Sequence, residues 1–288
     1  MADITATAVK ELRDQSGAGM MDCKKALTET DGNMEQAIDW LRKKGLAAAA
    51  KKSGRIAAEG LVAVQTAQNI GIVAEVNTET DFVARNPDFQ TFVKKIADTA
   101  LSQGGSFDQT VEASFENGKS VLESVTEMVS SIGENVTFRR SSGCSVKEGI
   151  VASYVHNASA PNMGKIGVIV GLESTGNMDT LEGFGKKLAM HIAAAKPEWI
   201  SPEDVGEEYA NREREILAGQ ARESGKPEEI VKKMVAGRMR KYFEEVCLLE
   251  QTFVIDGETK VSKAIELAEK EAGASIKITD FVRFHRFF

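Results

Sequence analysis

The sequence has 288 residues, more than one ordinary hydrophobic core requires, so two or more domains are expected. Its 42% hydrophobic and 27% charged residues are typical of a globular protein, and no apolar run approaches the roughly 20 residues that span a bilayer. Because the formal charge is −7, the chain has no general attraction for nucleic-acid phosphates, and we expect neither direct nucleic-acid binding nor a membrane partner.

Residues 1–54 are predicted to form a three-helix module followed by a linker. The apolar residues of the first helix share one face, and the small residues at 16–19 break it. Asn33 is expected to cap the third helix, with Gln36 in the capping-box position. The alanine-rich residues 46–50 are interpreted as the linker. So small a bundle resembles a ubiquitin-associated module, which docks on another protein.

Two methionines, Met20 and Met21, follow the glycine-containing break. Adaptable thioether side chains at this place either face a partner or fill the core of the module, and the sequence leaves both alternatives open. The N-terminus lacks a basic segment followed by an apolar one, so no secretory signal is expected and a cytoplasmic location fits.

A strand-like hairpin at residues 59–77 leads into a polar segment that contains Phe82. We expect this segment to be a loop tip, followed by a helix that Asp88 caps and that carries Phe89 and Phe92 on its apolar face. An aromatic residue in such a connection either folds back onto its own core or projects into a pocket of a partner.

An internal duplication organises the rest of the chain. Residues 59–64 recur as 148–153, and residues 70–73 recur as 166–169, with seven extra residues expected in a loop within 157–164. Each hairpin is followed by two amphipathic helices and a strand. The fold class is therefore α+β, with a duplicated β-β-α-α-β core. The domains predicted are 1–54, a first unit at 55–142, a second unit at 143–201 and 246–288, and an insertion at 202–245.

The insertion at 202–245 reads as an antiparallel helical hairpin. Its outgoing helix is expected to start at 201–204, and the small and polar residues at 224–227 turn the chain into the return helix. Such a hairpin either projects and forms a homodimer through its apolar stripe, or folds over the core.

Several motifs make the chain resemble the bacterial elongation factor Ts family over nearly its whole length. These are SGAGMMDCKKAL at 16–27, NTETDFVA at 77–84, IGEN at 132–135, HIAAAKP at 191–197 and LLEQ at 248–251. The resemblance implies a guanine nucleotide exchange factor for elongation factor Tu in translation elongation, with no cofactor of its own. It also implies that the loop at 80–83 enters the partner, where the aromatic ring wedges near the Mg²⁺ site and promotes release of GDP.

The same resemblance suggests which residues bind the partner. Those implied in the loop are Thr80, Asp81, Phe82 and Val83. Those implied elsewhere are Arg13, Met20, Met21 and Lys24 in the N-terminal module, and His156 on the core. The second unit has residues 174–178 in the place comparable to the loop, without an aromatic residue, which favours a function for Phe82.

Two other classes of protein compete with this interpretation. An enzyme could use Asp81 with His156, or Cys23 as a nucleophile, but the sequence has no phosphate-binding glycine loop and no nucleophile elbow. Its three cysteines are far apart and odd in number, which argues against a disulfide framework and a zinc site. An adaptor could bind partners through the N-terminal helices without altering them.

Overall fold

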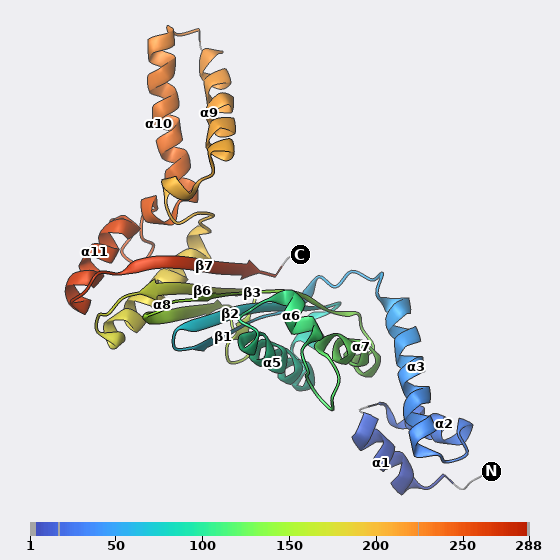
Figure 1. Cartoon of the computed structure of the whole chain (residues 1–288). Coiled ribbons are helices and arrows are strands. Elements are labelled where there is room, and N and C mark those ends of the chain that lie inside the picture. The colour runs from blue at the N-terminus through green and yellow to red at the C-terminus, as the bar shows by residue number, and fades with distance from the viewer. Residues whose placement is uncertain (1–3, 17, 224, 287–288) are drawn as a thin grey trace.

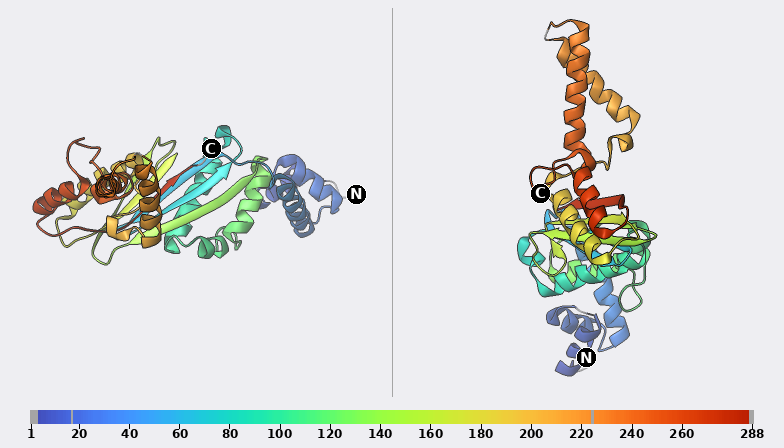
Figure 2. Two further views of the ribbon diagram at one scale, coloured as in Figure 1. Left: turned by 90° about the horizontal axis from the view of Figure 1, so that it is seen from above. Right: turned by 90° about the vertical axis from the view of Figure 1, so that its left-hand side faces the viewer.

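The computed structural model describes residues 4–16, 18–223 and 225–286 and folds them into a mixed α and β protein with antiparallel sheets. Two sheets pack face to face, and helices cover their outer faces (Figure 1). The N-terminal helices lie at one end, and a helical hairpin projects from the other (Figure 2). The α+β class with N-terminal helices is confirmed. Gly17 in the expected helix break and Ser224 in the expected hairpin turn lie outside the described residues.

The N-terminal module contains three helices around a small core. They are α1 (Ala6–Ser16), α2 (Met20–Glu29) and α3 (Met34–Lys52). Asn33 caps α3 as predicted, because its side chain accepts a hydrogen bond from the Gln36 amide at 3.0 Å. The linker expected at 46–50 is wrong, since α3 continues through it. Alanine is the strongest helix former, and Ala49 packs against the core of the first unit.

The first unit supplies three strands of a four-stranded sheet and the helices on its outer face. Its elements are β1 (Glu59–Ala67), β2 (Ile70–Thr78), α4 (Asp81–Ala84), α5 (Pro87–Ser102), α6 (Phe107–Glu112), α7 (Val121–Ile132) and β3 (Val136–Ser145). The sheet order is β3-β2-β1-β5, in which the short fourth strand, β5 (Met163–Gly164), comes from later in the chain. Leu61 and Ala63 face the helices, whereas Val62 and Val64 face the other sheet, so β1 is apolar on both sides. The cap of α5 is Asn86, not Asp88 as predicted, because a proline occupies the first helical position.

The second unit forms a three-stranded sheet in the order β4-β6-β7. Its elements are β4 (Gly149–His156), β5 (Met163–Gly164), β6 (Ile166–Glu173), α8 (Met178–Ala195), α11 (Val261–Ala272) and β7 (Lys277–His285). The expectation that a loop alone absorbs the seven extra residues is wrong. β5 lies within that segment and pairs antiparallel with β1 of the first unit.

The two units repeat an unusual backbone conformation near the open end of each hairpin. Gly60 pairs with Asn77, and Gly149 pairs with Glu173. Their φ angles are +124° and +122°, and an added Cβ atom would lie 2.2 Å or 2.1 Å from a carbonyl oxygen of the facing strand. Only glycine tolerates both the positive φ angle and the close carbonyl oxygen. The glycines at positions 60 and 149 are therefore required for the same physical reason.

The helical hairpin consists of α9 (Glu207–Arg222) and α10 (Glu228–Val246). The predicted start of its outgoing helix at 201–204 is wrong, because a 3-10 turn, η1 (Pro202–Asp204), precedes α9. The hairpin projects away from both sheets in Figure 1 and in the right-hand view of Figure 2, so the alternative that it folds over the core is also wrong. None of the helices in the described part of the chain is long and apolar enough to cross a membrane.

A buried polar contact anchors the base of the hairpin. His191 on α8 is fully buried, and its Nε2 lies 2.9 Å from Oε1 of Gln251. Its Nδ1 accepts a hydrogen bond from the amide of Val254 at 3.2 Å, and Gln251 in turn donates to the carbonyl of Glu245 at the end of α10. Burial lowers the pKa of His191 and outweighs the hydrogen bond to Gln251, which raises it. The ring is therefore neutral at neutral pH. Because Nδ1 accepts a hydrogen bond, the proton of the ring lies on Nε2, which donates to Gln251.

Candidate functional site

The segment that carries Phe82 forms one turn of helix between β2 and α5. Phe82 is 83% exposed, whereas Ala84 is buried in the core of the first unit and Val83 packs partly against that core. The alternative that Phe82 folds back onto its own core is therefore wrong. The expected loop tip is α4 with its flanking residues, and residues 80–85 are named the Phe82 turn below.

Thr80 begins the Phe82 turn and connects it to Glu134, which follows α7. The Thr80 hydroxyl accepts a hydrogen bond from the Val83 amide at 3.5 Å and donates to Oε1 of Glu134 at 2.6 Å. Oε2 of Glu134 accepts from the Thr80 amide at 3.0 Å and from the Thr78 hydroxyl at 2.9 Å. Both oxygens of one carboxylate thus hold the start of the turn.

The environment of Glu134 stabilises its charged form. Burial acts to raise its pKa, but the hydrogen bonds from Thr80 and Thr78 outweigh that effect, so the pKa lies below its ordinary value. Hydrogen bonds to a charged acceptor are stronger than those between neutral groups. At neutral pH, Glu134 is therefore an ionised acceptor for three donors.

A second set of contacts ties the same corner to the segment that comes from the N-terminal module. Glu79 accepts a hydrogen bond from the Asn135 amide at 2.6 Å and lies 3.4 Å from the Arg55 guanidinium. The buried side chain of Asn135 donates to the carbonyl of Arg55 at 2.8 Å. The Phe82 turn is thus fixed to the corner after α7 and to the chain before β1.

Asp81 lies beside Phe82 and is half exposed. Its carboxylate forms an ion pair with Arg85 at 2.9 Å, four residues later. Exposed pairs of this kind contribute little to stability, about 0.3–0.5 kcal/mol on a helix. Both side chains are therefore available to a partner at little cost.

Comparisons with known proteins show which family the chain is similar to. A family model described as Elongation factor TS matches residues 79–286, which include Phe82 and Glu134. An elongation factor Ts of Rhodospirillum centenum is 59% identical over 285 residues, covering 99% of this chain and 93% of that protein. Those of Paramagnetospirillum magneticum and Agrobacterium fabrum are each 55% identical, covering 99% and 98% of this chain and 91% and 92% of those proteins.

The chain belongs to the elongation factor Ts family. It is accordingly an elongation factor of protein biosynthesis. Two pairs of the motifs that resemble the family now have a structural explanation. IGEN at 132–135 supplies the carboxylate that holds NTETDFVA at 77–84, and HIAAAKP at 191–197 contacts LLEQ at 248–251 through His191 and Gln251.

The elongation factor Ts resemblance also indicated residues in the N-terminal module, and all of them are exposed. Met20 and Met21 are 53% and 77% exposed at the start of α2, so the alternative that they fill the core of the module is wrong. Arg13 on α1 and Lys24 on α2 are exposed as well. The core of the module is built from other residues, among them Val9, Leu12, Cys23, Ala26, Leu27, Ala37 and Leu41.

His156 lies apart from both groups, at the end of β4 in the second unit. It is exposed, and its Nδ1 lies 3.1 Å from the Tyr154 hydroxyl. The structure therefore places the residues indicated by the elongation factor Ts resemblance on three parts of the molecule: the Phe82 turn, the N-terminal module and the second unit.

The residues proposed for an enzyme do not come together. Asp81 pairs with Arg85, and His156 contacts Tyr154. Cys23 is fully buried in the N-terminal module, where its sulfur lies 3.6 Å from the carbonyl of Ala18. A buried thiol of this kind is a structural residue and not an accessible nucleophile.

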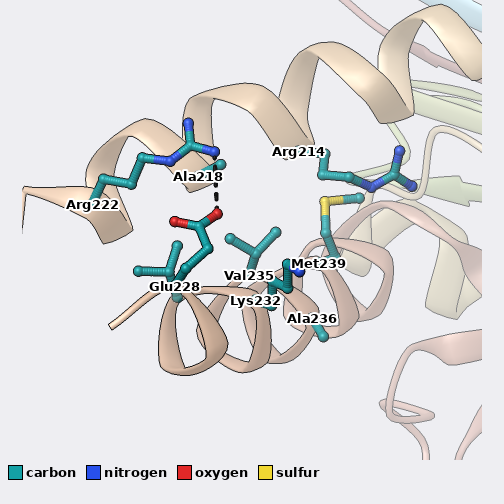
Figure 3. Close-up of a pocket in the computed structure, with 9 residues that line it drawn as sticks. Arg214, Ala218, Arg222, Glu228, Lys232, Val235, Ala236 and Met239 are labelled. Atoms are coloured by element: carbon teal, nitrogen blue, oxygen red, sulfur yellow. Dashed lines mark ion pairs between the residues drawn. The ribbon is translucent and has the colours of Figure 1, made fainter. Parts of the chain in front are cut away.

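The helical hairpin of this elongation factor Ts chain contains a cavity of about 480 Å³ between α9 and α10 (Figure 3). It is lined by Arg214, Ala218, Arg222, Glu228, Val231, Lys232, Val235, Ala236 and Met239. An ion pair of 3.5 Å between Arg222 and Glu228 joins the two helices near their turn. The cavity is a feature of the hairpin and is separate in sequence from the Phe82 turn.

Proposed function

We propose that the chain is a guanine nucleotide exchange factor for elongation factor Tu and not an enzyme with a catalytic residue of its own. The observation that carries the proposal is Phe82, a large aromatic side chain that is 83% exposed on a turn held by Glu134. An exposed aromatic residue on a fixed backbone is the kind of anchor that fills a pocket of a partner.

The mechanism we propose acts on the Mg²⁺ site of elongation factor Tu. Thr80, Asp81, Phe82 and Val83 would enter the partner, with the Phe82 ring as the wedge and the Asp81 charge beside it. Mg²⁺ supplies much of the counter-charge to a bound diphosphate, so displacing the groups that hold Mg²⁺ weakens GDP binding. In this proposal, Asp81 disturbs the surroundings of the metal and does not act as a base.

Further contacts are proposed outside the Phe82 turn. The N-terminal module has exposed apolar and basic side chains on α1 and α2, which suit docking on a partner; they are Arg13, Met20, Met21 and Lys24. His156 would contribute a polar contact from the second unit. The N-terminal module would thereby add affinity for elongation factor Tu, while the Phe82 turn would displace the groups that hold Mg²⁺ in it.

We also propose that the hairpin mediates self-association. Tyr209, Ile216 and Ile230 are exposed large apolar residues on its two helices, and they leave an apolar surface on a projecting element. Sedimentation velocity of the chain with and without the hairpin tests this. A monomer at all concentrations in both forms would refute it.

GDP release from elongation factor Tu tests the proposed function. An exchange factor accelerates release, an adaptor binds without accelerating it, and an enzyme does neither. By linkage, a factor that loosens GDP must itself be loosened by GDP through the same coupling free energy. Because the proposed wedge acts on the Mg²⁺ site, GDP with Mg²⁺ should dissociate a preformed complex more effectively than GDP alone. Binding that is independent of nucleotide would refute exchange and favour the adaptor.

A further inference from the structure

We propose that Glu134 is the positioning residue of the Phe82 turn, whose carboxylate fixes the direction in which Phe82 projects. This inference rests on the proposed function of Phe82. Glu134 reaches no partner in this proposal. It acts only through the turn that it holds.

The geometry of the turn explains why it needs such a residue. α4 has four residues, and an isolated helical segment of that length does not hold itself together in water. On its apolar side the turn is anchored by Val83 and Ala84. On its polar side Glu134 accepts hydrogen bonds from the amide and the hydroxyl of Thr80. The exposed ring of Phe82 therefore contributes little to holding its own backbone.

Glu134 is itself placed by a well-defined corner. Gly133 closes α7 in the left-handed conformation, with φ of +88°. A capping box between Ser120 and Glu123 fixes the other end of the same helix. Asn135, the next residue, is buried and holds the carbonyl of Arg55. The carboxylate thus projects from a rigid element onto the turn.

The second unit provides an internal comparison. Phe82 lies five residues after Asn77, and Met178 lies five residues after Glu173, the two positions that pair with the matching glycines of each hairpin. Met178 is therefore the counterpart of Phe82.

The corner after the closing helix can be matched in the same way. Gly273 closes α11 with φ of +76°, as Gly133 closes α7, and the residue that follows it is Ala274. The second unit thus has neither the projecting aromatic ring nor the carboxylate. Its own turn is held differently, by a hydrogen bond of 2.9 Å from the Asn177 amide to the carbonyl of Ala272. The shared β-β-α-α-β scaffold therefore does not require a glutamate at the corner after its closing helix. The glutamate occurs only in the copy that presents Phe82, which links it to the Phe82 turn.

Amide hydrogen exchange in the free protein tests the positioning step without any partner. In Glu134→Ala, exchange at the Thr80 and Val83 amides should accelerate by about tenfold or more, since three bonds to a charged acceptor are lost. Protection in β1, β2 and α5 should stay unchanged. Glu134→Gln keeps one acceptor oxygen and should give an intermediate result. Glu266→Ala, which removes an exposed carboxylate paired with Lys263 on α11, is the matched control.

GDP release from elongation factor Tu tests whether positioning matters for exchange. Glu134→Ala should slow the accelerated release by about tenfold, with Glu134→Gln in between. In the double variant Phe82→Ala, Glu134→Ala the loss should be smaller than the product of the two single losses, because the carboxylate acts through the turn that carries the ring. A purely structural role would instead give additive losses.

Three outcomes would overturn the inference. They are unchanged exchange at Thr80 in Glu134→Ala, loss of protection across the whole first unit in both variants, and additive losses in the double variant. Failure of the proposed function is distinguishable from these. If Phe82→Ala accelerates GDP release from elongation factor Tu as much as the native chain does, the proposed wedge role of Phe82 is wrong. Hydrogen exchange still decides whether Glu134 holds the turn.

Discussion

Truncation of Phe82 should separate function from stability. Its side chain is 83% exposed, so about one sixth of it is covered by the protein. Full burial of a phenylalanine contributes about 1.5–3 kcal/mol, so Phe82→Ala should cost less than about 0.5 kcal/mol of folding free energy. In a chain of this size, that corresponds to a fall in Tm of about 1–2 °C.

The effect on exchange should be far larger. Truncating an aromatic anchor at the centre of an interface costs about 2 kcal/mol or more, which corresponds to a loss of about 30-fold. Phe82→Ala should therefore reduce the acceleration of GDP release by at least about that factor. Stopped-flow release of a fluorescent GDP analogue from elongation factor Tu measures it, and thermal unfolding of the free variant measures the stability.

Phe89 supplies the matched control, because it has the same side chain on the following helix and is fully buried. Phe89→Ala should lose about 3–5 kcal/mol of folding free energy. The reasoning is refuted if Phe82→Ala destabilises the protein as much as Phe89→Ala does, or if it leaves GDP release at the native rate.

Three further predictions follow from the structure. Replacing residues 207–244 with a short glycine-rich linker should leave cooperative unfolding and accelerated GDP release intact, since the hairpin projects from the core; loss of the cooperative melt would contradict this. Because the folded pKa of His191 lies below its ordinary 6.5, the unfolded chain takes up the proton first, so the free energy of unfolding should fall as the pH drops below about 6.5. Denaturant titrations should show a shallower fall in His191→Asn, and an identical slope would refute the assignment. Burial raises the pKa of Cys144 to about 12 and that of Cys247 to about 11, so both thiols should resist iodoacetamide at pH 8 until denaturant is added, which mass spectrometry can follow.

Local sequence signals were sufficient where the physical cause is local. The Asn33 cap depends on residues within a few positions of each other. The exposure of Phe82 is different, because the local sequence left two alternatives open and only the duplication and the family resemblance favoured projection. The wrong cap at Asp88 had an available signal, because Pro87 at the first helical position places the cap at Asn86. The wrong linker at 46–50 likewise ignored the helix propensity of alanine.

Contacts between distant residues could not be predicted in this way. Thr80 and Glu134 are 54 positions apart, and the sequence shows only that each belongs to a motif. The motif IGEN at 132–135 pointed to Glu134 only as part of a family motif, and no neighbouring residue in the sequence indicates what its carboxylate binds. His191 and Gln251, 60 positions apart, were missed for the same reason. β5 is too short for a periodic pattern, and its partner strand lies about 100 residues earlier.

The placement of β5 has a consequence for how the chain folds during synthesis. The open edge of β1 receives its partner only when Met163 and Gly164 have left the ribosome. Until β4, β6 and β7 have all been synthesised, the valines at 62, 64 and 73 also lack the complete sheet that covers them. A nascent chain that ends near residue 145 would therefore expose an unpaired strand edge and an apolar face, both of which favour aggregation. The first sheet must wait for the second half of the chain before it is complete.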